Sequence, residues 1–254
     1  MKPISIQLYT LRKDVYPGGD DLPGVIRTVA EIGYKGVEFA GLHGNDPKDI
    51  RKLMDDLGIK CSSSHCGIPT KENISQIADQ ELILGNTRAI GGWGPDDLKT
   101  IDGVKKATDK LQEAAELLKP YGMTIGFHNH WWEFDTFIDG KRVYDLMMEG
   151  APDAFSELDL YWCAWGKSDP VETVKQYKSR LPLLHVKDGM LEVAHPHVAV
   201  GDGKLDFPAI FAATDMNVTQ WYIVELDAYD GPMIDPVKKS YQYLISNGLA
   251  EGNK

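Results

Sequence analysis

Seven consecutive residues, "HNHWWEF" at 128–134, combine two imidazoles, an amide and a carboxylate with two indoles. They directly follow an apolar run, "GMTIGF", at 122–127. Neighbouring imidazole and carboxylate groups are typical metal ligands, and the indoles would line the site around the metal. The alternative is a polar strand end whose tryptophans cover the core. The segment by itself leaves both interpretations open.

Further polar groups stand near the ends of other β-rich runs: Gln7, Glu38, His65, Asp159, His185, Lys187, Glu225 and Asp227. Side chains two residues apart on a strand share a face, which pairs Glu157 with Asp159 and Glu225 with Asp227. An acid inside an apolar run such as "YIVEL" is costly to bury without a partner. A divalent cation would serve several such groups at once.

One candidate ligand comes from each of the last four predicted strands: Glu133, Asp159, His185 and Glu225. Three carboxylates with one imidazole form an oxygen-rich set. Such a set favours Mn²⁺, Mg²⁺ or Co²⁺ over a structural zinc site, with zinc still possible. Each residue alone could instead be a helix cap, an ion-pair partner or a hydrogen-bonded core side chain.

Eight β-rich runs alternate with segments of helical period and would position these groups. The runs are 4–9, 36–40, 59–65, a stretch within 81–92, 123–130, 154–160, 182–186 and 221–228. The helical segments are 22–33, 46–58, 96–119, 169–179, 206–214 and 235–248, three of them opening on Asp-Pro.

This alternation predicts a single-domain (β/α)8 TIM barrel over residues 1–254, with its site at the carboxyl ends of the strands. A doubly wound open sheet is the alternative. It would usually carry fewer strands, and a Gly-rich first turn if it bound nucleotide, and "TLRKDVYPGGDD" after the first run contains no GxGxxG.

Composition excludes several other classes of protein. The net charge of −11 disfavours binding to nucleic acid, which requires a basic face. Three cysteines without a CxxC pair support neither a disulfide framework nor a cysteine zinc site. No signal peptide and no apolar run near 20 residues are found. We therefore expect a cytoplasmic protein without a membrane partner.

The ordered set "HNHWWEF", "ELDLYW", "LHVKDG", "VGDGKLDF" and "IVELD" resembles the xylose isomerase-like TIM-barrel superfamily. It is most similar to the sugar phosphate isomerases/epimerases, a group that includes ketose 3-epimerases and inosose dehydratases. The resemblance extends over nearly the whole chain, including "SIQLYTLR" and "EIGYKGVEF". It implies a metal held by Glu133, Asp159, His185 and Glu225.

The resemblance also implies removal of a proton from a carbon next to a carbonyl, through an enediolate that the metal stabilises. Glu133 and Glu225 would be the acid/base pair as well as ligands. The residues expected to contact a carbohydrate substrate are Glu38, His65, His128, His130, Trp162 and Lys187. Similar barrels often pair, so a homodimer or tetramer is possible.

One position departs from the ketose 3-epimerase pattern. Those enzymes carry a substrate-binding histidine three residues after the metal-binding aspartate, where this chain has Trp162. An indole offers a stacking face instead of a bridge between sugar oxygens. The leading hypothesis is a sugar isomerase or epimerase. The alternative is a lyase that removes water or an aglycone from a keto-sugar, keto-inositol or 3-keto-glycoside.

Two remaining hypotheses are disfavoured. An endonuclease for abasic DNA would need more metal-binding histidines and a basic surface, and a non-catalytic sugar-binding barrel would not need acid/base carboxylates. The segment "AVGDGKLD" at 199–206 could offer backbone N–H groups and Lys204 to a phosphate, but a turn before a helix is favoured. His195 and His197 are expected in a lid or on the surface.

Overall fold

The computed structural model describes residues 1–15, 21–192 and 196–254, and eight parallel strands form its centre. Their order around the sheet is β10, β9, β8, β5, β4, β3, β2 and β1, and β1 pairs back onto β10. The predicted (β/α)8 barrel is therefore confirmed. The strands are β1 (Lys2–Gln7), β2 (Gly36–Phe39), β3 (Lys60–His65), β4 (Arg88–Gly91), β5 (Thr124–His128), β8 (Phe155–Asp159), β9 (Leu183–Val186) and β10 (Trp221–Val224).

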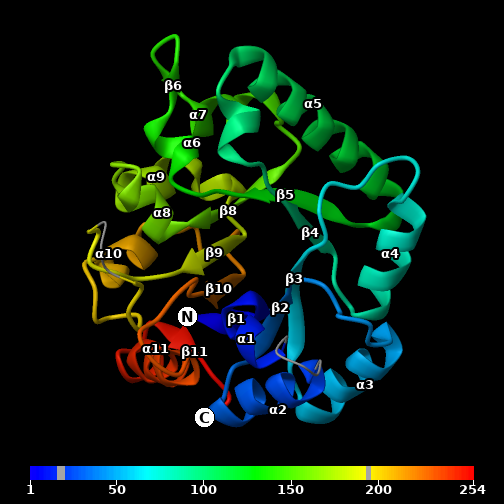
Figure 1. The fold of residues 1–254 in the computed structure, drawn as a ribbon, viewed down its shortest axis with the longest axis vertical. Coiled ribbons are helices and arrows are strands. Elements are labelled where there is room, and N and C mark those ends of the chain that lie inside the picture. Colours follow the sequence, from blue (N-terminus) through cyan, green and yellow to red (C-terminus); the bar gives the residue numbers. More distant parts are fainter. Residues whose placement is uncertain (16–20, 193–195) are drawn as a thin grey trace.

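Helices surround the strands on the outside (Figure 1). They are α1 (Arg12–Val15), α2 (Leu22–Ile32), α3 (Pro47–Leu57), α4 (Ile74–Ile83), α5 (Ile101–Leu118), α6 (Trp132–Asp135), α7 (Val143–Gly150), α8 (Leu160–Trp165), α9 (Pro170–Tyr177), α10 (Phe207–Ala212) and α11 (Ile234–Ser246). Every residue of β2, β8, β9 and β10 is buried, because helices cover the outer face of the barrel and side chains fill its interior.

Two of the three predicted Asp-Pro helix entries are confirmed. The Asp46 and Asp169 carboxylates accept hydrogen bonds from backbone N–H groups in the first turns of α3 and α9. The third differs, because α11 begins at Ile234 and places Asp235 inside its first turn.

The fourth predicted strand, expected somewhere within 81–92, is confirmed as β4, and a helix precedes it. Residues 74–83 form α4, whose buried residues Ile74, Ala78 and Glu81 follow a helical spacing. Strand β4 is confined to residues 88–91. A short hairpin of β6 (Phe137–Ile138) and β7 (Lys141–Arg142) follows α6 and projects at the top of Figure 1.

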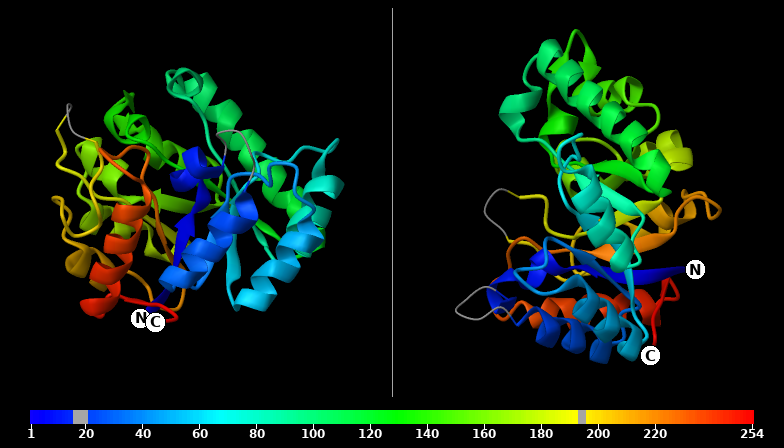
Figure 2. Two further views of the ribbon diagram at one scale, coloured as in Figure 1. Left: turned by 60° about the horizontal axis from the view of Figure 1, so that its bottom comes forward. Right: turned by 90° about the vertical axis from the view of Figure 1, so that its right-hand side faces the viewer.

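The two ends of the chain lie at one side of the barrel (Figure 2), where β11 (Ala250–Glu251) pairs with β1. Among the described residues, no helix is both long and apolar enough to span a membrane.

Candidate metal and substrate site

The strand register brings the predicted polar groups to one end of the barrel. Asp159 ends β8 directly beside His185 of β9, and His128 ends β5 beside Glu157 of β8. Glu225 follows the last residue of β10, next to β9. Because the strands are parallel, all these side chains meet at the carboxyl ends.

Two groups of side chains place their ligand atoms within 4.8 Å of one another, and His128 and His185 belong to both. The first group is His65, His128, Glu157 and His185, and the second is His128, Asp159, His185 and Glu225. Three of the four predicted ligands therefore lie together. Glu133, the fourth, belongs to neither group.

Glu133 was expected to be the metal ligand from the fifth barrel strand, but it lies beyond the end of that strand. Strand β5 ends at His128, and Glu133 is in α6, where its Oε2 accepts a hydrogen bond from the His130 backbone N–H at 2.9 Å. Burial raises the pKa of Glu133 to about 8. The side chain that the fifth barrel strand contributes to the groups is His128.

Glu157 is a site residue that sequence reasoning missed. It is fully buried, and its Oε2 lies 2.8 Å from His65 Nε2, 3.2 Å from His185 Nε2 and 3.3 Å from His128 Nδ1. Burial would raise the pKa of Glu157, but the His185 and His65 imidazoles lower it well below its ordinary value. The available signal was its position, two residues before Asp159 on the same strand face.

Glu38 was expected to contact substrate, but it lies in the barrel interior with no exposed surface. Its carboxylate accepts hydrogen bonds from Gln7 Nε2 and from the Ser63 hydroxyl, and Oε1 lies 2.7 Å from His185 Nε2. The other ring nitrogen of His185, Nδ1, lies 3.0 Å from Glu225 Oε2. Glu38 and Glu157 therefore hold one edge of His185 while its opposite edge faces Glu225.

Lys187 is a buried ammonium among carboxylates. Its Nζ lies 2.6 Å from Asp227, 2.9 Å from Glu225 and 3.2 Å from Asp159. Burial would lower the pKa of Lys187, but these carboxylates raise it well above its ordinary value. Burial would likewise raise the pKa of Glu225, while Lys187 and His185 lower it well below its usual range. Both groups are therefore charged at neutral pH.

The other predicted substrate contacts lie around this centre. The side chain of His65 is 28% exposed, and His130 and Trp162 are also partly exposed, whereas His128 is buried. Trp162 is in the first turn of α8, where its backbone N–H donates to Asp159 Oδ1 at 2.8 Å. Lys187 Nζ lies 5.0 Å from the centre of the Trp162 ring.

The donor set fits a divalent cation. Asp159 Oδ2, Glu157 Oε1 and His128 Nδ1 are buried atoms that make no hydrogen bond among the described residues. Two of them have an ionic neighbour: Asp159 Oδ2 lies 3.2 Å from Lys187 Nζ, and His128 Nδ1 lies 3.3 Å from Glu157 Oε2. Around Lys187 and His185 lie the five carboxylates Glu38, Glu157, Asp159, Glu225 and Asp227. Buried anions require positive charge nearby, and imidazole with carboxylate is a common ligand set for divalent metals.

The segment at 199–206 does not offer its N–H groups to a phosphate, because Asp188 already occupies them. Asp188 Oδ1 accepts hydrogen bonds from the backbone N–H groups of Gly189, Lys204 and Leu205, and Oδ2 from those of Gly201 and Gly203. A Cβ on Gly203 would lie 2.1 Å from Asp188 Oδ1, so this close approach requires glycine. The favoured interpretation, a turn before a helix, agrees with this structure.

His197 is buried rather than on the surface, and its Nδ1 accepts a hydrogen bond from the Asp227 backbone N–H at 3.0 Å. Its ring lies 5.3 Å from that of Trp162. His195 lies outside the described residues.

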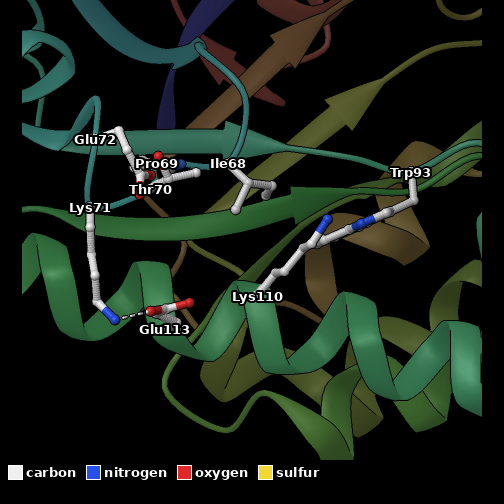
Figure 3. A pocket seen from close by; sticks show the side chains of 8 residues that line it. All are labelled: Ile68, Pro69, Thr70, Lys71, Glu72, Trp93, Lys110 and Glu113. Atoms are coloured by element: carbon white, nitrogen blue, oxygen red, sulfur yellow. Dashed lines mark ion pairs between the residues drawn. The ribbon is translucent and has the colours of Figure 1, made fainter.

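A pocket of about 390 Å³ lies away from these groups, between α5 and the segments that follow β3 and β4 (Figure 3). Its lining includes Trp93 and an ion pair between Lys71 and Glu113 at 2.8 Å. None of its lining residues belongs to the metal-ligand groups, so this pocket is separate from the candidate site.

Comparisons with known proteins agree with this geometry. An inosose dehydratase of Geobacillus kaustophilus (strain HTA426) is 26% identical over 261 residues, covering 82% of this chain and 83% of the relative. The crystal structure of a sugar phosphate isomerase/epimerase from Parabacteroides distasonis ATCC 8503 is 28% identical, with a TM-score of 0.81 over 99% of this chain and 100% of that one.

A third structure, of the IOLI protein with a bound zinc atom, shares the fold at 17% identity, with a TM-score of 0.73 over 97% of this chain and 99% of that one. The family model described as "Xylose isomerase-like TIM barrel" matches residues 26–247. The chain belongs to the xylose isomerase-like TIM barrel family.

Proposed function

We propose that this protein is a divalent-metal-dependent enzyme that removes a proton from the carbon next to the carbonyl of a keto-sugar or keto-inositol. The observation that carries the proposal is the convergence of Asp159, His185 and Glu225 with His128, whose ligand atoms all lie within 4.8 Å of one another. A protein without a cation or substrate for these groups would bury them at a cost in stability.

His128, Asp159, His185 and Glu225 would hold the cation, so His128 replaces Glu133 in the proposed ligand set. Two imidazoles with two carboxylates suit Mn²⁺, Co²⁺ or Zn²⁺ better than Mg²⁺. The zinc in the similar IOLI structure is consistent with such a site. When bound, the cation supplies Lewis-acid stabilisation of negative charge on the oxygens of the substrate.

Glu225 is the proposed base, because Lys187 and His185 keep its carboxylate ionised at neutral pH. Glu133 remains the proposed partner acid, because its pKa of about 8 keeps it protonated near neutral pH. Glu38 and Glu157 orient His185, and Lys187 holds Glu225 in place through its ion pair at 2.9 Å.

We propose elimination as the outcome of proton removal. The proton leaves the carbon next to the carbonyl, and the electron pair of the broken C–H bond forms a double bond to the next carbon. The oxygen substituent on that carbon departs with its bonding pair and takes up a proton, giving water or an alcohol. The similarity to an inosose dehydratase supports this outcome, as does Trp162 in place of a hydroxyl-bridging histidine.

Isomerisation or epimerisation is the second candidate. It requires the same proton removal, followed by return of a proton without loss of a substituent. The similarity to the sugar phosphate isomerase/epimerase structure favours it.

Proton NMR in D₂O tests both candidates, with Mn²⁺, Co²⁺ or Zn²⁺ added in catalytic amounts to keto-inositols, 3-keto-glycosides, free ketoses and sugar phosphates. Loss of water or an alcohol that stops with EDTA would support the lyase. Metal-dependent deuterium uptake with every substituent retained would instead establish an isomerase or epimerase. No metal-dependent reaction with any of these substrates would contradict the proposed function.

A further inference from the structure

Five aromatic side chains lie in contact with one another beside the metal-ligand groups. We name this set the tryptophan wall, and its members are His130, Trp131, Trp132, Trp162 and Trp165. They come from the segment after β5 and from α8. The His130 and Trp132 rings stack at 4.2 Å, Trp131 lies 4.9 Å from Trp162, and Trp162 lies 6.1 Å from Trp165. All five side chains are partly exposed.

The wall adjoins the candidate site at two points. At one, the His130 ring lies 5.0 Å from the ring of His128, a proposed ligand. At the other, Lys187 Nζ lies 5.0 Å from the centre of the Trp162 ring. A molecule that reached from the ligand groups over Trp162 would therefore continue onto Trp131 and Trp165.

Three polar atoms of the wall are buried without a hydrogen-bond partner among the described residues: His130 Nδ1, Trp132 Nε1 and Trp162 Nε1. An indole N–H usually finds an acceptor when it is buried, and leaving it unpaired costs stability. A purely apolar ligand would leave all three atoms unpaired. A sugar ring offers both an apolar C–H face and hydroxyl oxygens.

We infer that the tryptophan wall binds a second sugar ring, joined by a glycosidic bond to the ring that reacts at the metal-ligand groups. The substrate class is therefore a glycoside of a keto-sugar. The bond that breaks is the glycosidic C–O bond, and the second sugar departs with its oxygen, takes up a proton and is released in place of water. This inference rests on the proposed function. It goes beyond that function because a keto-inositol or free ketose would fill only the reacting position and leave the wall uncovered.

The test uses unreactive probes, so that binding is measured apart from the reaction. Cellobiose and glucose are titrated into the protein with Zn²⁺ present, followed by saturation-transfer NMR. The protein is expected to bind cellobiose about tenfold more tightly than glucose, since tenfold corresponds to roughly 1.4 kcal/mol of additional contact.

Trp131→Ala should remove most of this preference and leave glucose binding unchanged. Trp162→Phe, which keeps a ring face but lacks the N–H, should weaken cellobiose binding about threefold to tenfold. Phe137→Ala is the matched control, because Phe137 is a 61% exposed aromatic residue outside the wall. Circular dichroism melts verify folding, and Trp131→Phe replaces Trp131→Ala if the latter is unfolded.

Equal affinities for cellobiose and glucose, or an unchanged preference in folded Trp131 and Trp162 variants, would overturn the inference. That failure is distinct from a failure of the proposed function. The latter would appear as no metal-dependent reaction of the unmodified protein with any keto-substrate, whichever sugar the wall binds.

Discussion

Asp159 and Asp188 are two fully buried aspartates at the carboxyl end of the same barrel, and their surroundings differ sharply. Both oxygens of Asp188 are hydrogen-bonded, to five backbone N–H groups in all. Asp159 accepts one such bond, from the Trp162 N–H to Oδ1. Its Oδ2 lies 3.2 Å from the Lys187 ammonium and accepts no hydrogen bond among the described residues.

The comparison separates structural from functional carboxylates. A carboxylate whose lone pairs are filled by the backbone stabilises the fold and has little capacity left for a ligand. One that is buried with an unfilled oxygen lowers stability unless a ligand completes it. Asp188 therefore fixes the segment at 201–205 beside the end of β9. Asp159 Oδ2, which has an ion pair but no hydrogen bond, is the better candidate for binding a cation or substrate.

The largest expected effect is the loss of activity in Asp159→Asn. The amide can still cap α8 through its oxygen but cannot supply the anionic ligand, so the turnover of whichever keto-substrate reacts should fall by about a thousandfold. The melting temperature should change little, because Lys187 loses one ion pair but keeps those with Glu225 and Asp227. Turnover and thermal melts are measured together, and a variant of full activity would exclude Asp159 from the site.

The matched substitution Asp188→Asn should show the opposite pattern. Its amide N–H₂ would face backbone donors, and the free energy of unfolding should fall by about 2–4 kcal/mol. Urea denaturation gives this value. Activity per folded molecule should change only a few fold. A loss of activity as large as that of Asp159→Asn, without loss of stability, would contradict the structural role of Asp188.

Glu157→Gln should weaken the affinity for the cation about 10- to 100-fold, because Glu157 orients His185 from the side opposite Glu225. Calorimetric titration with Zn²⁺ measures this without any substrate. Glu149→Gln, which removes an exposed carboxylate paired with Lys141, is the control. Unchanged affinity would show that Glu157 has no part in positioning the ligand.

The smallest expected effect is a pH dependence due to Glu133. Its pKa is raised from 4.5 to about 8 on folding, so its contribution to stability is full below pH 4.5 and is lost as the pH rises through 8. Between pH 7 and pH 9 the loss is about 1.4 kcal/mol. Urea denaturation in EDTA at both pH values should show this fall in the free energy of unfolding for the unmodified protein and not for Glu133→Gln. An equal fall in both proteins would contradict the raised pKa of Glu133.

The sequence predicted the barrel, the end of the barrel at which polar side chains converge and most of those side chains. Strand alternation and the strand-end positions of Asp159, His185 and Glu225 contained that information. The family resemblance agrees with the family match. The cytoplasmic location and the homo-oligomeric state stay predictions.

The sequence did not show that His128, and not Glu133, lies among the clustered side chains, because both stand in one short polar segment. That choice depends on where β5 ends and α6 begins, which is set by pairing of β5 with its neighbours. Glu38 was expected to face substrate for a similar reason. Its burial beside His185 results from barrel closure, which brings β2 and β9 together across the interior.

Local patterns thus determined which residues are polar, where strands and helices alternate, and which chemistry those residue types allow. Only the tertiary structure decided which polar atoms are already satisfied and which remain unfilled. The contact of His185 Nε2 with Glu38 Oε1, for example, joins residues 147 positions apart. Partners this distant along the chain are brought together by the folding of the whole barrel, and no local spacing specifies them.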